Sequence, residues 1–530
     1  MHDQPGTTVT VPGFSRALEK DLKSLTKGGC FFDAATLEQF SSDESWYKIN
    51  PIAVLQPRDA SEVAAVTHYC YERELPLIPR GGATGLAGQA IGMGIILDFT
   101  RHMNSVKDST DSTVTAEPGV VLRTLNEVLA GAGKYFPVDP ASVSRCTLGG
   151  MIGTNAAGAH GVLHGAMKDH VQELTVILSN GESARVSQPQ HTDGLRNPFL
   201  RQITDTLTPL LLKNRDVIAR HFPDVRKNSS GYNLKDAVAA DDLDLLKLIV
   251  GSEGTLATVV QAVLHIESVP PHRLGAIAYL SSYEQAMDAT ILALDYEPAA
   301  IEILDQTYVG LVRGLSPETD ELIMEGAKVM LYFEFEGSSE DELRGSIVRL
   351  AGALSSVLPL RFLPLTHEEE LRRLWKLREE ASRVINTHTS SGKTSFVEDV
   401  AVPVRELPRY IKGLKSILEH HHIEFCLYGH AGSGNIHCAT FVDLADLRHY
   451  RIIDTLASDI YELAISLGGT LSGEHGDGLV RTPFLERLYG PQVFNLFRTV
   501  KATFDPRNIL NPGKIIGDQN TTILHDLDLS

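Results

Sequence analysis

The stretch PRGGATGLAGQ, residues 79–89, decides how the first part of this chain folds. It continues the apolar run LPLIP, which is preceded by a helical pattern at 60–74 and a strand pattern at 52–58. Strand, helix, strand and glycine loop in this order predict a βαβ unit. The glycines would let backbone N–H groups converge on an anion beside Arg80 and Thr84. Because the Rossmann spacing and the Walker lysine are both missing, the loop alone fits a phosphate site and a plain flexible loop equally.

A second small-residue stretch, TLGGMIGTNAAGAHG, covers residues 147–161. Glycine or alanine stands at nearly every position where a larger side chain would block close approach, and Thr147, Thr154 and Asn155 supply polar groups. Such a surface suits a flat ligand that hydrogen-bonds to the backbone. A turn packed tightly on a sheet is the alternative. Further along, LLKLIVGSEGTLATVV (245–260) reads as a strand, a glycine turn and a strand.

Composition limits the classes of function. With 530 residues, the chain exceeds what one hydrophobic core supports and predicts two or three domains. The formal charge of -19 makes nucleic acid and anionic lipid surfaces poor partners. Five cysteines without a CxxC pair indicate free thiols in a reducing compartment and exclude an iron–sulfur cluster of the chain's own. Since no secretory signal and no transmembrane run of about 18 apolar residues is found, we expect a cytoplasmic protein that contacts a membrane only through a partner.

A proline-rich stretch near residue 270 (SVPPHRLG) marks the predicted boundary to a second domain. Beyond it, strand and helix patterns alternate as in two βαβ units of an α+β domain, up to about residue 357. A strong amphipathic helix is predicted at 366–387, and the last helical segments at about 483–503.

Two basic residues near that strong helix are candidates for binding a substrate carboxylate. Arg378 is the better one, since a guanidinium binds a carboxylate through two hydrogen bonds. The alternative is a solvated arginine paired with Glu379 or Glu380. Lys393 lies in SSGKT, which resembles the end of a phosphate loop but lacks its first glycine, so an ATPase is disfavoured and the ammonium could meet a substrate carboxylate instead.

The segment IEFCLYGHAGSGNIHCATFV (423–442) reads as a β-hairpin with a glycine turn. If a tight turn centres on Ser433 and Gly434, His430 and His437 are directly opposed, about 5 Å apart between Cβ atoms, and close enough to share a metal ion. Two hydrogen-bonded histidines at a strand end are the ordinary alternative.

A later segment, LSGEHGDGLVR (471–481), supplies what the histidine pair lacks. Glu474 and His475 stand among glycines, so the backbone is free to aim both side chains inward although they are adjacent. Two imidazoles and a carboxylate with open positions suit Zn²⁺, Mn²⁺ or Fe²⁺. The sequence therefore predicts a divalent metal site.

Five motifs now form an ordered set: PRGGATGL, CTLGGMIGTNAAG, KNSSGYNL, VGSEGTLATVV and ILNPGKI. In this order they resemble the FAD-linked oxidoreductases of the vanillyl-alcohol oxidase type, and most closely the D-lactate, D-2-hydroxyglutarate and glycolate dehydrogenase branch, over about residues 48–516. The resemblance implies an α+β fold with a two-part FAD-binding domain and an α+β substrate domain of ferredoxin-like βαβ units with a C-terminal helical segment. It divides the chain into an FAD-binding domain (1–270), a substrate- and metal-binding domain (271–500) and a C-terminal segment that returns to the FAD domain (501–530).

The same resemblance implies which residues hold FAD. The first loop would bind the pyrophosphate, the second would line the adenine and isoalloxazine channel, and the ILNPGKI segment would lie near the ring. The residues expected to bind FAD are Pro79, Arg80, Gly81, Gly82, Ala83, Thr84, Gly85, Leu86, Thr147, Gly149, Gly150, Gly153, Thr154, Asn155, Gly158, Glu253 and Asn511.

The family resemblance also implies which residues bind a metal and which one acts as a base. GHAGSGNIH is similar to the family's GHxGDGNxH motif and SGEHG to its xEHG motif, in which two histidines and the glutamate hold a divalent metal and the next histidine acts as base. Here Ser433 replaces the usual aspartate, which would alter turn geometry or bonds around the ligands without removing a ligand. The residues concerned are the metal ligands His430, His437 and Glu474 and the base His475.

These parts together predict oxidation of a small D-2-hydroxy acid to a 2-oxo acid, with D-lactate or D-2-hydroxyglutarate favoured and glycolate also compatible. Arg378 would hold the carboxylate with Ser382, which the resemblance places one helical turn away, and Lys393 would assist. The metal would lower the pKa of the 2-hydroxyl, and His475 would remove its proton as the C2 hydride moves to flavin N5.

Electrons would then pass to a separate acceptor, either an iron–sulfur subunit, an electron-transfer flavoprotein or a quinone. Two alternatives stay open: an FAD-dependent transferase like the alkyl-ether-lipid synthases, and a non-catalytic flavin subunit of a dehydrogenase complex. Association into a homo-oligomer is left open as well.

Overall fold

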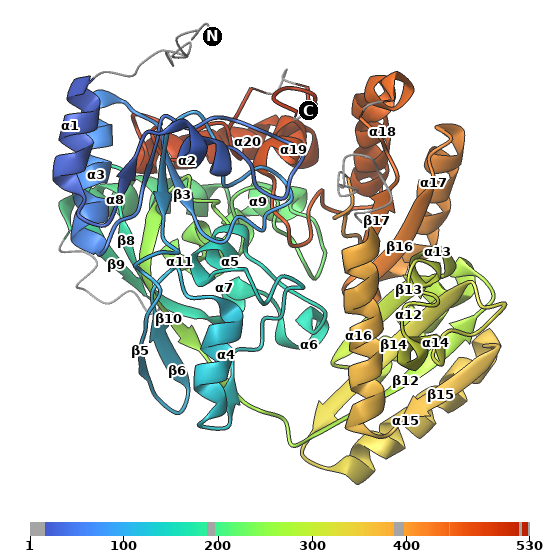
Figure 1. Ribbon diagram of the computed structural model, residues 1–530. Helices are drawn as coiled ribbons and strands as arrows, with labels where there is room; N and C mark the ends of the chain where they lie inside the picture. Colours follow the sequence, from blue (N-terminus) through green and yellow to red (C-terminus); the bar gives the residue numbers. More distant parts are fainter. Residues whose placement is uncertain (1–15, 188–196, 386–396, 445, 519–521, 528–530) are drawn as a thin grey trace, which may run out of the picture.

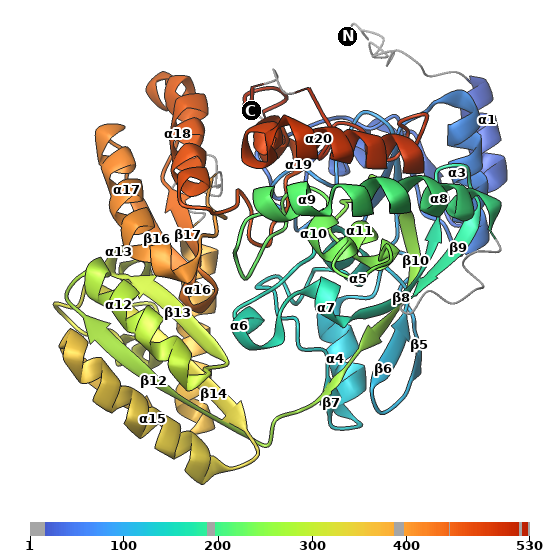
Figure 2. The same cartoon turned by 180° about the vertical axis from the view of Figure 1, so that it is seen from behind.

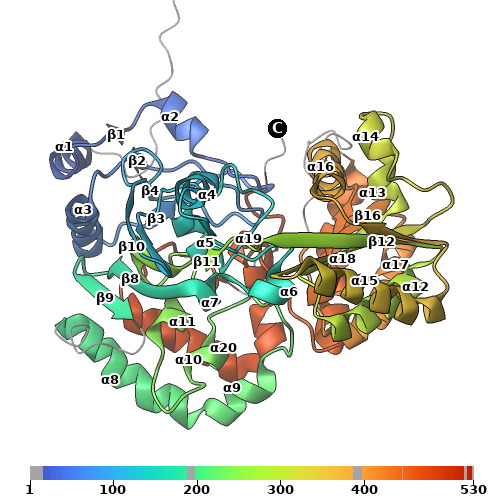
Figure 3. The same ribbon diagram turned by 90° about the horizontal axis from the view of Figure 1, so that it is seen from below.

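The computed structural model describes residues 16–187, 197–385, 397–444, 446–518 and 522–527, except for the side chain of Ser382 (Figure 1). Two lobes lie side by side in all three views, the first built from the N-terminal half together with the last helices of the chain (Figures 1, 2 and 3). Among the helices of these segments, none combines the length and the apolar character that crossing a bilayer requires. All five cysteines are described, and they form no disulfide.

The first sheet contains the predicted βαβ unit. Helix α3 (Ala60–Arg73) connects two of its strands and begins at Asp59, whose carboxylate accepts hydrogen bonds from the first free N–H groups of the helix. Strands β2, β4 and β3 are parallel, which confirms the unit. In spatial order the sheet consists of β1 (Cys30–Phe31), β2 (Ala53–Leu55), β4 (Ile95–Asp98) and β3 (Leu77–Arg80). Because β3 ends at Arg80, the glycine loop starts exactly where the sheet stops.

The end of the chain returns to this sheet. The backbone N–H of Leu77 donates to Ile509 (2.7 Å), and the N–H of Asn511 donates back to Leu77 (2.8 Å). These bonds extend the edge of the sheet beside β3 with residues more than 400 positions away in the sequence.

A second, five-stranded sheet is antiparallel and carries helices on one side (Figure 2). The strand predicted at 245–250 is wrong, because these residues form helix α11 (Leu245–Ile249). The reason lies in Asp244, whose carboxylate accepts from the N–H groups of Leu246 and Lys247 and so starts a helix. The sheet, in order, and its helices are β5 (Val106–Ser109), β6 (Thr113–Ala116), β10 (Thr258–His265), β8 (Val171–Ile177), β9 (Ser183–Ser187), α8 (Pro198–Lys213), α9 (Arg215–His221) and α20 (Leu485–Phe504).

The third sheet forms the second lobe and is antiparallel throughout. Its first four strands follow the chain order 4-1-3-2, with one helix after the first strand and one after the third, which confirms the predicted ferredoxin-like βαβ pair. A hairpin extends the sheet at one edge. The strands, in spatial order, are β15 (Arg361–Leu365), β12 (His272–Leu280), β14 (Val329–Gly337), β13 (Ala300–Asp305), β16 (Phe425–His430) and β17 (Asn435–Thr440).

Helices cover both faces of this sheet (Figure 3). Helices α12 (Tyr283–Ala293) and α15 (Glu340–Leu354) lie on one face, where they pack with the even-numbered residues of β12. Helix α16 (Glu368–Ile385) lies on the other, where Leu371, Leu374 and Leu377 pack with its odd-numbered residues. The helix predicted at 366–387 is thereby confirmed over the described residues.

Further elements complete the two lobes. Two of them are long helices on either side of the hairpin in sequence: α17 (Leu407–His420) precedes β16, and α18 (Leu447–Ser466) follows β17. The others are α1 (Arg16–Leu25), α2 (Ala34–Gln39), α4 (Leu122–Ala130), β7 (Lys134–Tyr135), α5 (Leu148–Thr154), α6 (Gly161–His164), α7 (Met167–His170), α10 (Leu234–Ala237), β11 (Glu267–Ser268), α13 (Gln306–Gly310), α14 (Pro317–Asp320) and α19 (Gly478–Arg481).

Two histidines of the first lobe contact carboxylates of the second. The Nδ1 of His160 lies 2.6 Å from Asp139 of its own lobe, and its Nε2 lies 3.0 Å from Glu334 on β14. The Nε2 of His164 lies 2.7 Å from Glu336 on the same strand. Burial would lower the pKa of His160, but the carboxylates of Asp139 and Glu334 raise it well above the ordinary value. A charged histidine therefore joins the two lobes.

Candidate active site

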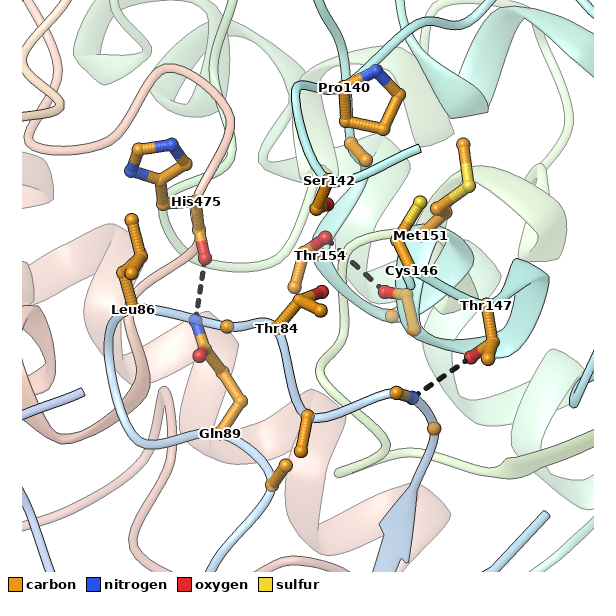
Figure 4. Close-up of a pocket in the computed structure, with 18 of the residues that line it drawn as sticks. Thr84, Leu86, Gln89, Pro140, Ser142, Cys146, Thr147, Met151, Thr154 and His475 are labelled. Atoms are coloured by element: carbon orange, nitrogen blue, oxygen red, sulfur yellow. Dashed lines mark hydrogen bonds between the residues drawn. The ribbon is translucent and has the colours of Figure 1, made fainter. Parts of the chain in front are cut away.

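A cavity of about 490 Å³ lies where the two lobes meet. Both glycine-rich loops line one end of the cavity. Figure 4 shows polar side chains of this end together with Cys146 and Met151. Side chains of α16, the β16–β17 hairpin and the 474–475 turn line the other end. The cavity thus brings together motifs that are separated by almost 400 residues in sequence.

The two loops touch so closely that glycine is needed between them. A Cβ on Gly81 would lie 2.2 Å from the hydroxyl of Thr147, and one on Gly82 would lie 2.2 Å from the carbonyl of Arg145. In the observed structure the N–H of Gly82 donates to that hydroxyl at 3.3 Å (Figure 4). The first loop is therefore held against the second, and its backbone forms one wall of the cavity.

The far end of the first loop is tied to the turn that carries His475. The side-chain amide of Gln89 donates to the backbone carbonyl of His475 (2.6 Å; Figure 4) and to Glu253 (3.3 Å). The Glu253 carboxylate also accepts from the N–H groups of Asp477 and Gly478. Burial raises the pKa of Glu253 to about 7.

Most residues expected to bind FAD line this cavity, namely Pro79, Arg80, Gly81, Gly82, Ala83, Thr84, Gly85, Leu86, Thr147, Gly149, Gly150, Gly153, Thr154 and Glu253. Three do not. Asn155 ends α5 and accepts from the N–H of Lys168, Gly158 packs against Asp139, and the amide of Asn511 donates to the carbonyls of Gln89 and Glu253. These three residues shape the walls behind the cavity.

Arg80 lines the cavity, but its guanidinium binds backbone carbonyl groups outside it. It donates to the backbone carbonyls of Phe40, Ser42 and Ala90 at 2.9 to 3.3 Å. Its burial lowers its pKa. The observed contacts of this side chain fix the start of the loop to neighbouring backbone.

The hairpin carries the two predicted histidines, but the predicted register is wrong. His430 pairs with Asn435, and His437 pairs with Tyr428. A four-residue loop, 431–434, replaces the predicted two-residue turn because residues 431–433 form a 3₁₀ turn before Gly434 takes a left-handed conformation. The two histidines are diagonal neighbours on one face instead, with ring centres 5.1 Å apart.

Glu474 lies between these histidines. Its Oε1 is 2.8 Å from Nε2 of His430 and 3.3 Å from Nε2 of His437, while its Oε2 accepts from the ammonium of Lys227 at 2.8 Å. Burial alone would raise the pKa of Glu474, but the charges of His430 and Lys227 hold it well below its ordinary value. The three predicted ligands thus converge around one ionised carboxylate.

Four side chains at this end of the cavity carry atoms of the kinds that bind divalent metals, and this set has Asp399 and His475 where the prediction had His430. Ligand atoms of Asp399, His437, Glu474 and His475 lie within 4.8 Å of one another. Burial lowers the pKa of His437, which keeps its imidazole neutral and able to donate a lone pair. The second carboxylate, Asp399, was not among the predicted ligands.

His475 is held by two acidic neighbours. Its Nδ1 lies 2.8 Å from Glu398, and its backbone N–H donates to Asp399 at 2.7 Å. Its ring stacks on that of His437 at 5.1 Å. Burial would lower the pKa of His475, but Asp399 and Glu398 raise it to about 9. The ring is therefore oriented through Nδ1, with Nε2 on its opposite edge.

Arg378 of α16 lies at the same end of the cavity. Its Nε is 2.8 Å from Glu302, and its guanidinium is 5.6 Å from the Trp375 ring. The Nε of Arg378 therefore pairs with Glu302 and not with Glu379 or Glu380, the alternative partners. Ser382 has no described side chain, and Lys393 lies outside the described residues.

The sequence reasoning missed four buried charged residues that hold this site together: Lys227, Glu302, Glu398 and Asp399. A signal existed for two of them. Glu302 interrupts the apolar run AAIEIL of a strand, and a lone charge in such a run requires a buried partner. Lys227 is the first residue of the quoted KNSSGYNL motif.

Comparison with known proteins gives two matches to protein families. Residues 51–187 match the FAD binding domain family, and residues 269–515 match the C-terminal domain of FAD linked oxidases. Solved structures share the fold: p-cresol methylhydroxylase (TM-score 0.71, 12% identity) and 4-ethylphenol oxidase from Gulosibacter chungangensis (TM-score 0.70, 16% identity), each over 96% of this chain and 99% of the other. The predicted vanillyl-alcohol oxidase type of fold is therefore confirmed.

Among curated proteins, the probable mitochondrial D-lactate dehydrogenase of Danio rerio is 31% identical over 92% of this chain and 89% of its own length. The glycolate oxidase subunit GlcD of Bacillus subtilis is 29% identical over 88% and 90%. A D-2-hydroxyglutarate dehydrogenase of Pantoea ananatis is 30% identical over 95% of this chain, which spans only 52% of that longer protein. These matches agree with the resemblance seen in the motifs, and the chain belongs to the FAD-linked oxidase family of the D-lactate and D-2-hydroxyglutarate dehydrogenases.

Proposed function

We propose that this chain oxidises a D-2-hydroxy acid to the 2-oxo acid with FAD as the oxidant. The observation that carries the proposal is the convergence of Arg378, His475 and the group around Glu474 at one end of a cavity whose other end is lined by glycine loops. The names of the relatives support D-2-hydroxyglutarate, D-lactate and glycolate as the substrates to test.

The cavity fits FAD in its wall chemistry. The loops at 79–89 and 147–154 present backbone and hydroxyl groups, and the closeness of Gly81 and Gly82 to the second loop leaves the wall without bulky side chains. When bound, FAD supplies a hydride acceptor for C2 of the hydroxy acid. We assign the FAD domain to residues 1–270 with 501–530, and the substrate domain to 271–500.

The residues that would hold a divalent metal are His430, His437 and Glu474, with Asp399 beside them. A metal there, Zn²⁺, Mn²⁺ or Fe²⁺, would act as a Lewis acid on the 2-hydroxyl. The neutral imidazole of His437 and the ionised carboxylate of Glu474 are the protonation states that ligation requires. His430 differs, because Glu302 and Glu474 outweigh its burial and raise its pKa, so its ring would release a proton when a metal binds.

The chain's own side chains perform the remaining tasks. Arg378 orients the substrate carboxylate, together with Ser382 and Lys393 in the expected arrangement. His475 removes the hydroxyl proton through Nε2, because Glu398 holds its Nδ1. A pKa of about 9 means that His475 carries a proton at pH 7 in this structure and must lose it before acting.

The onward electron acceptor is proposed to be a separate protein or quinone, with an iron–sulfur subunit or an electron-transfer flavoprotein as the protein candidates. The five unpaired cysteines support a reducing compartment, and we keep the cytoplasm as the proposed location. Contact with a membrane would be made through that partner.

Anaerobic stopped-flow spectroscopy tests the proposal. The FAD-loaded protein is mixed with D-lactate, D-2-hydroxyglutarate and glycolate, each against its L-enantiomer where one exists, and flavin bleaching is followed. We expect rapid bleaching by at least one D-acid and none with His475→Ala. If no 2-hydroxy acid bleaches a fully loaded flavin, the dehydrogenase proposal is refuted. Metal analysis supplies a second criterion, because the dehydrogenase should hold a divalent metal at Glu474, whereas a transferase or a non-catalytic subunit would hold none.

A further inference from the structure

Glu302 is a buried carboxylate that touches both halves of the proposed chemistry. It lies on β13, in the middle of the third sheet, and only 1% of its surface is exposed. Its Oε1 is 2.7 Å from Nδ1 of His430, and its Oε2 is 2.8 Å from Nε of Arg378. No motif of the sequence pointed to this residue.

We propose that Glu302 is a positioning residue that sets the orientation of His430 for metal binding and of Arg378 for the substrate carboxylate. The inference rests on the proposed function, since it concerns the two groups that would bind metal and substrate. Glu302 itself touches neither, and it acts only through its two partners.

The argument on the metal side concerns the imidazole of His430. With Nδ1 bound to Glu302, the ring has its other nitrogen, Nε2, directed at Glu474 at 2.8 Å. A carboxylate behind a histidine fixes which nitrogen carries the proton, prevents rotation of the ring and increases the basicity of the ligating nitrogen. Without Glu302, His430 would be a poorer ligand although its own atoms are unchanged.

On the substrate side, the same carboxylate holds the guanidinium plane. Its ion pair with Nε joins the α16 side chain to the sheet, and the Trp375 ring flanks the guanidinium at 5.6 Å. A guanidinium already fixed in its plane loses less freedom when it binds a carboxylate. Because one residue serves both groups, loss of Glu302 should weaken metal and substrate binding together.

The adjacent strand offers a matched control in Glu334. This residue is equally buried, at 1% exposure, and its carboxylate also contacts a histidine, His160, at 3.0 Å. The register of the strands pairs Glu302 with Tyr332, so the two glutamates lie two residues apart on neighbouring strands. Glu334→Gln therefore removes a buried charge in the same sheet without touching His430. It is a control for the metal Kd alone, because Glu334 also accepts from Nε1 of Trp375 at 2.9 Å.

The test measures metal binding directly on FAD-loaded protein freed of metal by chelator. Calorimetric titration with Mn²⁺ or Zn²⁺ is done for wild type, Glu302→Gln and Glu334→Gln, followed by KM for D-lactate and D-2-hydroxyglutarate on the metal-loaded proteins. We expect the metal Kd of Glu302→Gln to rise about 10–100-fold, with a raised KM, and that of Glu334→Gln to stay within about twofold of wild type. If Glu302→Gln is not folded, Glu302→Asp serves instead, because a carboxylate shorter by one methylene loses contact with at least one partner.

A metal Kd in Glu302→Gln that matches wild type overturns the inference while leaving the proposed function intact. An equal loss in Glu334→Gln overturns it as well, since the effect would then belong to any buried charge in the sheet. If the wild-type protein binds neither ion, the metal site of the proposed function is refuted. The proposed effect of Glu302 on His430 as a metal ligand is then refuted as well. The three failures are therefore distinguishable.

Discussion

Replacement of Glu398 by glutamine tests quantitatively how the proposed base is tuned. Glu398 lies 2.8 Å from Nδ1 of His475, and Asp399 lies 3.8 Å from the same nitrogen. Against the effect of burial, these carboxylates raise the pKa of His475 from its ordinary value of about 6.5 to about 9. Such a rise corresponds to roughly 3 kcal/mol in favour of the protonated ring.

The base works only when it is neutral, so the rate of flavin reduction should increase with pH along an acid limb set by His475. Glu398→Gln removes the hydrogen-bonded negative charge but leaves Asp399 in place. We expect the acid limb to move to lower pH by roughly one pH unit, which is about 1.4 kcal/mol. The plateau rate should fall at the same time, because a glutamine orients the ring less strongly than a carboxylate does.

The assay is anaerobic stopped-flow bleaching with saturating D-2-hydroxy acid across the pH range, in wild type and Glu398→Gln. The control is Glu406→Gln, which also removes one negative charge but from a surface ion pair with Arg409. The tested quantity is the difference between proteins, so a constant contribution from bound metal drops out. An acid limb that stays in place in Glu398→Gln, or moves as far in Glu406→Gln, would refute the reasoning.

Three further predictions follow from the structure. Gly81→Ala places a Cβ 2.2 Å from the Thr147 hydroxyl and should purify with little FAD, measured by absorbance after denaturation, whereas Gly352→Ala in α15, where a Cβ meets nothing within 4 Å, should retain FAD. Chelation of divalent metal should abolish bleaching by the hydroxy acid while the flavin spectrum persists, and re-addition of metal should restore it; unchanged bleaching would contradict the assigned Lewis acid. Because the folded pKa of His160 is raised, its contribution to stability is fully present below the unfolded pKa of about 6.5 and is lost as pH rises through the higher folded value. His160→Gln should therefore lower Tm most at acidic pH, and thermal unfolding that shows a larger loss at alkaline pH would contradict the proposed charge.

Local patterns made part of the fold predictable. The βαβ unit could be foreseen because α3 has apolar residues at helical spacing and its cap at Asp59, and because the glycine loop directly follows β3. Helix α16 could be foreseen from its leucines at helical spacing. Helix α11 could not, because an apolar run of six residues fits a buried strand equally well and its outcome depended on Asp244 alone.

The candidate site was predictable in its residue types and not in its connections. The motifs identified Glu474 and His475, but the hairpin register depended on a loop conformation that the glycines alone do not determine. The partners of the site, Glu302 and Lys227, come from separate strands and loops and meet it only through tertiary packing. Contacts of this kind have no characteristic sequence separation, so the sequence alone does not indicate them.

The backbone bonds between Leu77 and the segment at 509–511 have a consequence for how the protein is made. During synthesis, residues 53–98 emerge early, but the edge beside β3 stays unpaired until more than 400 further residues have been translated. At roughly 5–20 residues per second, that interval lasts about 20 to 80 seconds. An exposed strand edge of this kind invites pairing with other chains. The first sheet thus keeps an edge open to such pairing throughout most of the protein's synthesis.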